Sequence, residues 1–243
     1  MLEIDKLKEI VSTARRIVAF TGAGISAESG IPTYRGDDGV WHKYDPNKYA
    51  NIHNFLKDPQ YYWNFFKEVR YPVIKKAKPN KAHIALARLE ENGKLEAVIT
   101  QNIDDLHQLA GSKRILELHG NTRRISCLNC KKQHTMDEVY SRLETQLPPL
   151  CSECSGILKP EVVFFGESLP VTVLEEAINV TNDCDLFLAI GSSLVVQPAA
   201  SLPFTAKEKG AKLIIINKDA TPLDTFADIV FHTTASEVLD KMQ

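Results

Sequence analysis

The 243-residue sequence has no apolar run approaching the ~18 residues that a membrane-spanning helix needs, and its amino terminus is charged rather than signal-like. The net charge is only −2, so the sequence lacks the basic excess that is typical of nucleic-acid binders. It also lacks repeats and low-complexity tracts. We therefore expect a globular cytoplasmic protein with no membrane partner and no direct, specific nucleic-acid partner.

Cysteine is scarce, but four of the five cysteines form two C-x2-C pairs separated by twenty residues: Cys127, Cys130, Cys151 and Cys154. In a reducing compartment such pairs predict metal ligands rather than disulfides. Four thiolates complete a tetrahedral shell and leave no position for water, so the spacing predicts one structural zinc ion. His134 is a possible substitute ligand, although the shell is complete without it. We interpret Cys184, beside an apolar run, as a core residue.

Short apolar runs rich in Val, Ile and Leu alternate with helical or polar sequence, at 16–22, 95–100, 114–120, 185–193 and 212–219, with a weaker run at 228–232. Buried strands separated by helices predict an α/β fold, a doubly wound parallel sheet of the Rossmann-like kind. Two stretches break the rhythm and predict a smaller inserted zinc-ribbon and helical domain. We assign 1–30, 81–120 and 162–243 to the large domain, and 31–80 and 121–161 to the small one.

A glycine-rich segment, Gly22-Ala23-Gly24-Ile25-Ser26-Ala27, follows the first predicted strand. It fits G-x-G-x-x-A, in which glycines allow close approach to a pyrophosphate at the start of a helix. A dehydrogenase of this type would carry an acidic residue ~20 positions later, at the end of a second strand. Here that distance falls in a loop rich in proline and aromatic residues. The segment predicts a dinucleotide ligand without hydride transfer.

Further motifs appear in order along almost the whole chain: GAGISAESGIPTYRG (22–36), TQNIDDLH (100–107), ELHGN (117–121), the cysteine pairs, KPEVVFFGE (159–167), GSSLVVQPA (191–199) and INKD (216–219). As a set they strongly resemble the sirtuin family of NAD-dependent protein deacylases, in its prokaryotic, zinc-containing form. The resemblance implies NAD as cofactor and an acylated-lysine protein or peptide as substrate.

The resemblance also assigns cofactor contacts to residues that follow the predicted strands. It places the pyrophosphate and ribose near Gly22, Ala23, Gly24, Ala27, Gly191, Ser192 and Ser193. A mobile cofactor loop would contain Thr33, Tyr34 and Arg35. The nicotinamide pocket would be lined by Gln101, Asn102, Ile103 and Asp104, and the adenosine side by Asn217, Lys218, Asp219 and Ala235.

His119 matches the family's catalytic base, and Asn102 and Asp104 are implied to assist catalysis by holding ribose, nicotinamide or water. The implied reaction joins the acyl oxygen of lysine to the nicotinamide ribose as nicotinamide leaves, and ends in free lysine and O-acyl-ADP-ribose. Neutral His119 would withdraw a proton from the ribose hydroxyls. Of the other six histidines, His107 follows QNID closely enough to remain of interest.

The substrate residues implied by the resemblance lie in two segments. Val162, Phe164 and Phe165 would form an apolar tunnel for the lysine stem, although the same residues also suit a plain strand core. The backbones at Gly166, Glu167, Leu194 and Val195 would pair with the peptide as an added strand.

Two departures bear on the acyl group. Pro32 is followed by Thr33, as in the branch that includes desuccinylases, but the Tyr and Arg with which that branch binds acidic acyl groups align with Phe66 and Val69. A buried carboxylate would then lack its guanidinium partner. We therefore predict deacetylation, with longer apolar chains left open and weak desuccinylation. Arg70 is adjacent, so a shift of one residue would restore the acidic-acyl interpretation.

Three other functions are compatible with parts of the pattern. A zinc-ribbon nucleic-acid adaptor would bind DNA in a salt-dependent way, which the acidic charge disfavours. An NAD-dependent oxidoreductase would change NADH absorbance, whereas a deacylase releases nicotinamide. Within the family, a mono-ADP-ribosyltransferase would leave labelled ADP-ribose on protein.

Overall fold

The computed structural model describes residues 2–35 and 39–242. Its main feature is a six-stranded sheet of order β3-β2-β1-β7-β8-β9 in which every neighbouring pair is parallel. The strands are β1 (Ile17–Thr21), β2 (Leu95–Thr100), β3 (Ile115–Glu117), β7 (Leu186–Ile190), β8 (Lys212–Ile216) and β9 (Ile229–Phe231). This order, which turns back on itself between β1 and β7, is that of dinucleotide-binding sheets. It confirms the predicted fold class.

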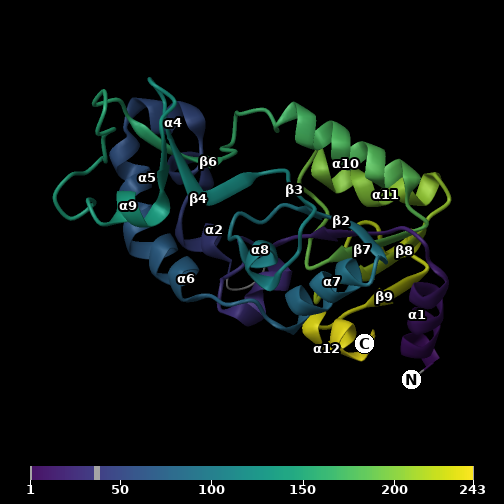
Figure 1. Ribbon diagram of the computed structural model, residues 1–243. Helices are drawn as coiled ribbons and strands as arrows, with labels where there is room; N and C mark the ends of the chain where they lie inside the picture. The colour runs from purple at the N-terminus through teal and green to yellow at the C-terminus, as the bar shows by residue number, and fades with distance from the viewer. Residues whose placement is uncertain (1, 36–38, 243) are drawn as a thin grey trace.

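Both faces of the sheet are covered, which explains why its strands are apolar throughout. Along β1, Ile17 and Ala19 pack in one core while Val18 and Phe20 pack in the other. Figure 1 shows the helices of the two layers on opposite sides of the sheet. One layer contains α1 (Leu2–Thr13), α7 (Lys81–Glu91) and α12 (Ala235–Leu239), and the other contains α10 (Val171–Asp183) and α11 (Leu202–Glu208).

The segment after β1 differs from the expected α-helix. It forms a seven-residue 3-10 helix, η1 (Ala23–Ser29), and ends at Gly30 in a left-handed conformation. The side chains of Asn80 and Asp104 hold this segment from outside, through the Ile25 carbonyl and the Ser26 hydroxyl. Tertiary hydrogen bonds therefore replace part of the bonding that a regular helix would provide.

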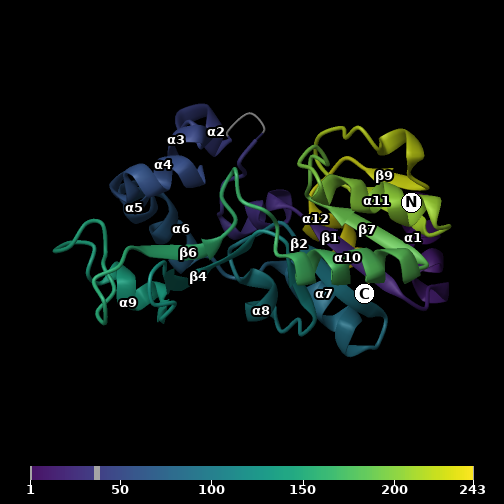
Figure 2. The same ribbon diagram turned by 90° about the horizontal axis from the view of Figure 1, so that it is seen from above.

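A second lobe is formed by the two inserted stretches (Figure 2). The first gives short helices: α2 (Val40–Lys43), α3 (Pro46–Tyr49), α4 (Ile52–Lys57), α5 (Pro59–Phe65), a π-helical turn η2 (Phe66–Arg70) and α6 (Tyr71–Lys76). The second gives an antiparallel sheet of order β5-β4-β6, with β4 (Gly120–Cys127), β5 (Gln133–Thr135), α9 (Met136–Tyr140) and β6 (Leu158–Val162). Trp63 and Phe66 from the first stretch share one core with Ile125 and Leu158 from the second.

The strands of the small sheet were not expected from the sequence, because they are partly polar; β4, for example, contains Asn121, Thr122, Arg123 and Arg124. The remaining elements are connecting turns: α8 (Leu106–Ala110), η3 (Ala199–Ser201), η4 (Asp224–Phe226) and η5 (Asp240–Met242). At the carboxyl end, α12 passes directly into η5. No helix in 2–35 or 39–242 is both long and apolar enough to cross a bilayer.

Gly120 joins the two sheets in a conformation that only glycine adopts easily, with φ +76°. A Cβ there would lie 1.9 Å from the Glu161 carbonyl oxygen, whereas Gly210, with φ +96°, has open space around it. We predict that Gly210→Ala lowers the free energy of unfolding by about 1 kcal/mol, from left-handed strain alone. Gly120→Ala should lower the free energy of unfolding by about 1–3 kcal/mol more than Gly210→Ala does, because β6 must move to make room for the Cβ. Urea unfolding measures both, and equal losses would contradict the clash.

Candidate active site and metal centre

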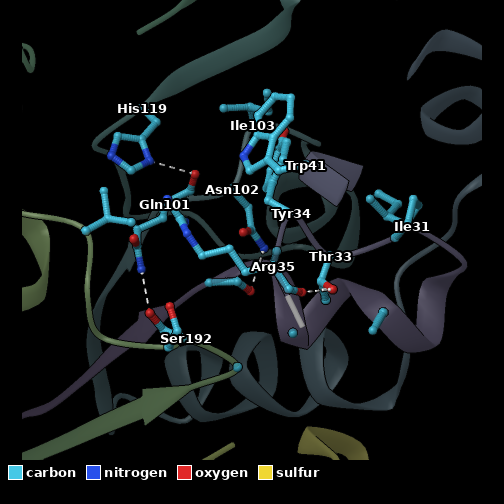
Figure 3. A pocket seen from close by; sticks show the side chains of 18 of the residues that line it. Ile31, Thr33, Tyr34, Arg35, Trp41, Gln101, Asn102, Ile103, His119 and Ser192 are labelled. Carbon is cyan, nitrogen blue, oxygen red and sulfur yellow. Dashed lines mark hydrogen bonds between the residues drawn. The ribbon is translucent and has the colours of Figure 1, made fainter. Parts of the chain in front are cut away.

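A cavity of about 880 Å³ lies where the carboxyl ends of the parallel strands meet the small lobe. In open parallel sheets this edge, at the point where the strand order reverses, is where ligands bind. The cavity wall takes in segments after β1, β2, β7 and β8, together with aromatic residues of the second lobe. Figure 3 shows His119, Gln101, Asn102 and Ser192 from the sheet side, facing Tyr34 and Trp41.

Three glycines bring the loops after β1 and β7 into contact. The Gly24 amide donates to the Gly191 carbonyl at 2.8 Å, and a Cβ on Gly24 would lie 2.7 Å from the Gly191 Cα. A Cβ on Gly22 would lie 2.7 Å from the Gly191 carbonyl oxygen. Glycine is therefore required here by loop packing, independently of any pyrophosphate. Gly22, Ala23, Gly24 and Ala27 line the cavity, as do Gly191, Ser192 and Ser193.

The residues after β2 form a buried polar network. The side-chain amide of Gln101 donates through Nε2 to the Ser192 hydroxyl at 2.8 Å, and this bond connects the end of β2 to the loop after β7. Asn102 donates through Nδ2 to the Gly22 carbonyl and to Ser26 Oγ, each at 3.1 Å. Ser26 in turn donates to Asp104 Oδ2 at 2.7 Å. Gln101, Asn102 and Ile103 line the cavity.

Asp104 lies behind this network and, unlike Gln101, Asn102 and Ile103, is not among the cavity-lining residues. Its carboxylate is 4% exposed and accepts hydrogen bonds from Ser26 Oγ and the Leu106 amide. Burial raises the pKa of Asp104 above its ordinary value, and these two hydrogen bonds oppose the change. Asp104 therefore holds the η1 segment through Ser26.

His119 lies in the turn between β3 and β4 and lines the cavity. Its Nδ1 is 3.1 Å from the Gln101 carbonyl oxygen, and its own carbonyl accepts from the Val163 amide at 2.9 Å. Because a carbonyl only accepts, Nδ1 carries the proton in the neutral ring and Nε2 presents a lone pair. Burial lowers the pKa of His119, the hydrogen bond to Gln101 opposes this, and the charge of Arg35 lowers it further. The imidazole is therefore neutral near pH 7.

The segment after Pro32 is tied to the small lobe by Arg70. The Arg70 guanidinium donates to the Tyr34 hydroxyl at 2.8 Å and lies 4.9 Å from the centre of that ring. Thr33, Tyr34 and Arg35 line the cavity; residue 36, the last of the first matching segment, lies outside the described residues. Arg70 is 5% exposed and belongs to the cavity wall, whereas Val69 does not.

This position of Arg70 corrects the sequence alignment on one point. Phe66 and Arg70 stand four residues apart, at the two ends of the π-helical turn η2, and both line the cavity. A guanidinium is thus present in the wall, one position later than expected. Its hydrogen bond to Tyr34 engages it with the cofactor loop.

The segment after β6 forms the opposite wall. Val162, Phe164, Phe165, Gly166 and Glu167 all line the cavity. Buried Lys159 supports them, since its ammonium donates to the Val162 carbonyl at 2.8 Å and pairs with Glu167 at 2.9 Å. Phe165 is 43% exposed, which is unusual for phenylalanine and places it at the rim.

On the side of β8, Asn217, Lys218, Asp219 and Ala235 line the cavity as the sequence suggested. Leu194 and Val195 are not among the lining residues. The Leu194 side chain is buried in the core beneath α11, and Val195 is 50% exposed. Only their backbones remain candidates for contact with a peptide.

Several lining residues were not expected from the sequence, notably Trp41, Tyr49, Tyr62, Phe65 and Thr122. Most belong to the stretch 31–80, whose richness in aromatic residues was the available signal. Their stacking, such as Tyr34 on Trp41 at 5.1 Å between ring centres, depends on contacts that no local pattern encodes.

The four paired cysteines meet at the end of the small lobe, with all four sulfur atoms within 4.8 Å of one another. Cys127 and Cys151 are buried within the lobe's core, and Cys130 is exposed. Four sulfur donors this close fit the tetrahedral shell of one zinc ion. Cys184 is buried in the core between the sheet and α10, as expected.

The fold and the cavity together define an α/β protein of the dinucleotide-binding class that carries a four-cysteine metal module. A sequence profile of the Sir2 family matches residues 22–198, and the chain belongs to this family, the sirtuins. It is 49% identical to an NAD-dependent protein deacetylase of Sulfurisphaera tokodaii, over 98% of this chain and 94% of the relative. It is 48% identical to NAD-dependent protein deacylase 2 of Archaeoglobus fulgidus, over 99% and 94%.

Solved structures give the same result. A Sir2 protein with a deacetylated peptide and 3′-O-acetyl ADP ribose matches with a TM-score of 0.94 at 43% identity, covering 98% of this chain and 96% of that one. A Sir2 protein with a peptide and NAD+ matches with a TM-score of 0.92 at 42% identity, with the same coverage.

The metal site predicts that removing zinc unfolds the small lobe. Chelation should release one zinc per chain and shift the fluorescence of Trp63, whose indole is buried and donates to the Leu158 carbonyl at 3.0 Å. The loss of stability should be large, because zinc modules of this kind gain on the order of 10 kcal/mol from the metal. Cys151→Ser should act like chelation, and Cys184→Ala should retain one zinc. A zinc-free protein with native fluorescence would refute this role.

Proposed function

We propose that the protein is an NAD-dependent protein-lysine deacetylase or deacylase that transfers the acyl group from lysine to ADP-ribose and releases nicotinamide. The observation that carries this proposal is the position of His119. It lines the cavity together with Gln101 and the segment Val162–Glu167, and the Gln101 carbonyl holds its Nδ1, so Nε2 carries the lone pair. The family membership and the names of its relatives support the same reaction.

The cavity suits NAD in size and in its donor groups. Its volume lies in the upper part of the ~300–1,000 Å³ range of ligand pockets. The loops after β1 and β7 would hold the pyrophosphate, and Asn217, Lys218, Asp219 and Ala235 the adenosine. When bound, NAD supplies a glycosidic bond whose cleavage releases nicotinamide and leaves a ribose that accepts the acyl group.

His119 acts as the base in this proposal. With Nδ1 held by the Gln101 carbonyl, Nε2 is the atom that takes the proton from a ribose hydroxyl. The same hydrogen bond fixes the plane of the ring. Gln101 also donates to Ser192, so the base and the phosphate-side loop are positioned by one residue.

Asn102 orients the nicotinamide ribose or an attacking water, while Asp104 contributes by holding Ser26. The acyl-lysine enters along Val162 and Phe164, whose apolar side chains exclude water from its stem. At the rim, the Phe165 amide and carbonyl already bond to Ala50 and Ile52. The peptide would therefore pair with the backbones of Gly166, Glu167 and Val195.

One core on each face of the large sheet and a separate core in the second lobe support a division into a large domain of 1–30, 81–120 and 162–243 and a small domain of 31–80 and 121–161. The cavity lies between them. Four clustered thiols suit a reducing compartment, which supports a cytoplasmic location. We further infer that the substrate is a protein and that nucleic acid plays no direct part.

The acyl group that the enzyme prefers is an uncharged one. Phe66, Val162 and Phe164 give an apolar wall, and Arg70 is engaged with Tyr34. With acetyl-, myristoyl- and succinyl-lysine peptides, we predict that nicotinamide release is about 10- to 100-fold more efficient for acetyl than for succinyl, since a poorly paired buried carboxylate costs ~1–3 kcal/mol. Arg70→Met serves as the control and should not widen that ratio.

A higher rate with the succinyl peptide, abolished in Arg70→Met, would instead make Arg70 an acidic-acyl site. Labelled NAD tests the family alternative, because a mono-ADP-ribosyltransferase would leave label on protein. With the label in the ADP-ribose part of NAD, a deacylase should leave all of it in free O-acyl-ADP-ribose and none on protein.

His119→Ala should lower kcat at least about 100-fold, as expected for loss of a general base, while NAD binding measured by calorimetry changes little. In the native enzyme the neutral imidazole is the active form, and its pKa lies below the ordinary 6.5. The acidic limb of kcat/KM should therefore have its midpoint below pH 6.5. Full activity in His119→Ala, or a midpoint above 6.5, would reject the assignment.

A further inference from the structure

Two buried histidines lie behind the cavity and take no part in the mechanism above. His83 is on α7 and His107 on α8, with 0% and 2% of their surfaces exposed. Their ring centres are 4.9 Å apart. Neither is among the cavity-lining residues. Buried polar groups of this kind need hydrogen-bond partners, and those partners lead to the active site.

A chain of hydrogen bonds connects His107 to the backbone of Asn102. His107 Nε2 is 2.9 Å from Thr21 Oγ1, and Thr21 Oγ1 donates to Thr100 Oγ1 at 2.8 Å. Thr100 Oγ1 accepts from the Asn102 amide at 3.0 Å. Thr21 and Thr100 are the last residues of β1 and β2, and both are buried. The chain therefore crosses the floor of the site where these strands end.

The donors along this chain determine the form of the ring. Thr21 gives its only proton to Thr100, so it accepts from His107, and Nε2 of His107 must carry hydrogen. Nδ1 of His107 has no hydrogen-bond partner among the described residues. A threonine oxygen can fill this central position because a hydroxyl donates and accepts at once.

His83 supports His107 from the other side. Its Nδ1 is 3.0 Å from Asn80 Oδ1, and Asn80 also donates to the Ile25 carbonyl at 2.7 Å. The start of α7 is thereby connected to the η1 segment. Burial lowers the pKa of His83 to about 4. Burial also lowers the pKa of His107 well below its ordinary value, and the neighbouring His83 lowers it further because two adjacent rings cannot both take a proton cheaply. Both rings are neutral, in agreement with the hydrogen-bond pattern.

We propose that His107 is a positioning residue of the active site: through Thr21 and Thr100 it fixes the backbone of Asn102, and with it the side chain that meets the nicotinamide ribose. Its effect on catalysis rests on the proposed function, whereas its effect on Asn102 does not. Asn102 Nδ2 makes two bonds at 3.1 Å, to Gly22 and Ser26, so a small shift of its backbone would loosen both.

The variants separate hydrogen bonding from space filling. His107→Gln keeps a donor near the Nε2 position, and His107→Leu fills the space without one. Thr21→Val removes the central hydroxyl at nearly constant volume. The matched control is Thr181→Val, since Thr181 is equally buried on α10 and its hydroxyl has no partner among the described residues.

We expect His107→Leu and Thr21→Val to lower kcat/KM for NAD about 10-fold or more, because misplaced catalytic groups lose rate steeply. KM for the peptide should stay within about 2-fold, since this chain of hydrogen bonds does not reach the wall formed by Val162 to Glu167. His107→Gln should retain most activity, and Thr181→Val all of it. A Leu variant as active as the Gln variant would overturn the proposal.

Hydrogen exchange of the Asn102 amide gives a readout that needs no turnover. Its protection should fall in His107→Leu and Thr21→Val and stay unchanged in Thr181→Val. Unchanged protection in all variants would overturn the positioning role. If the native protein released no nicotinamide, the proposed function would fail, and the exchange data would still decide the role of His107.

Discussion

The site depends on the contact between Gly24 and Gly191, where the loops after β1 and β7 pack with no side chain between them. The strand order reverses at this point, so the loops diverge from it to opposite sides of the sheet and leave a cavity at its edge. Any larger residue at these positions would separate the loops. Gln101 donates to Ser192 across the same junction, so His119, held by the Gln101 carbonyl, takes its position from it too.

A layer of buried polar side chains lies beneath this junction, at the ends of β1 and β2. Thr21, Thr100 and Asn102 are each no more than 7% exposed, and each has partners within the layer. Such a layer stabilises one arrangement only, because a displaced member would leave a buried group unpaired. Because each member must stay paired, the cavity floor is more rigid than apolar packing alone would make it. The proposed roles of His119 and Asn102 require such rigidity, since both depend on exact positions.

The sequence predicted what depends on local pattern. Six apolar runs became the six parallel strands, and the cysteine spacing brought four sulfur atoms together, since both signals lie in consecutive residues. It failed where distant contacts decide. The η1 segment is a 3-10 helix, and Asn80 and Asp104 hold it through side-chain hydrogen bonds that no local pattern encodes. Arg70 lines the cavity from the end of a π-helical turn and bonds to Tyr34, a contact that spacing alone does not reveal.

The metal module belongs to the active site through its core. Cys127 and Cys151 pack in the same cluster as Trp63, Val162 and Phe164, and the last two side chains form the cavity wall. A closed shell of four thiolates leaves the ion no place in the chemistry. In the proposed reaction the ion would act by ordering β4 and β6. These strands pair with each other and lead into the segment from Val162 to Glu167, which bonds to His119 through the Val163 amide. The cysteine cluster, the cavity wall and His119 are therefore successive parts of one packed structure.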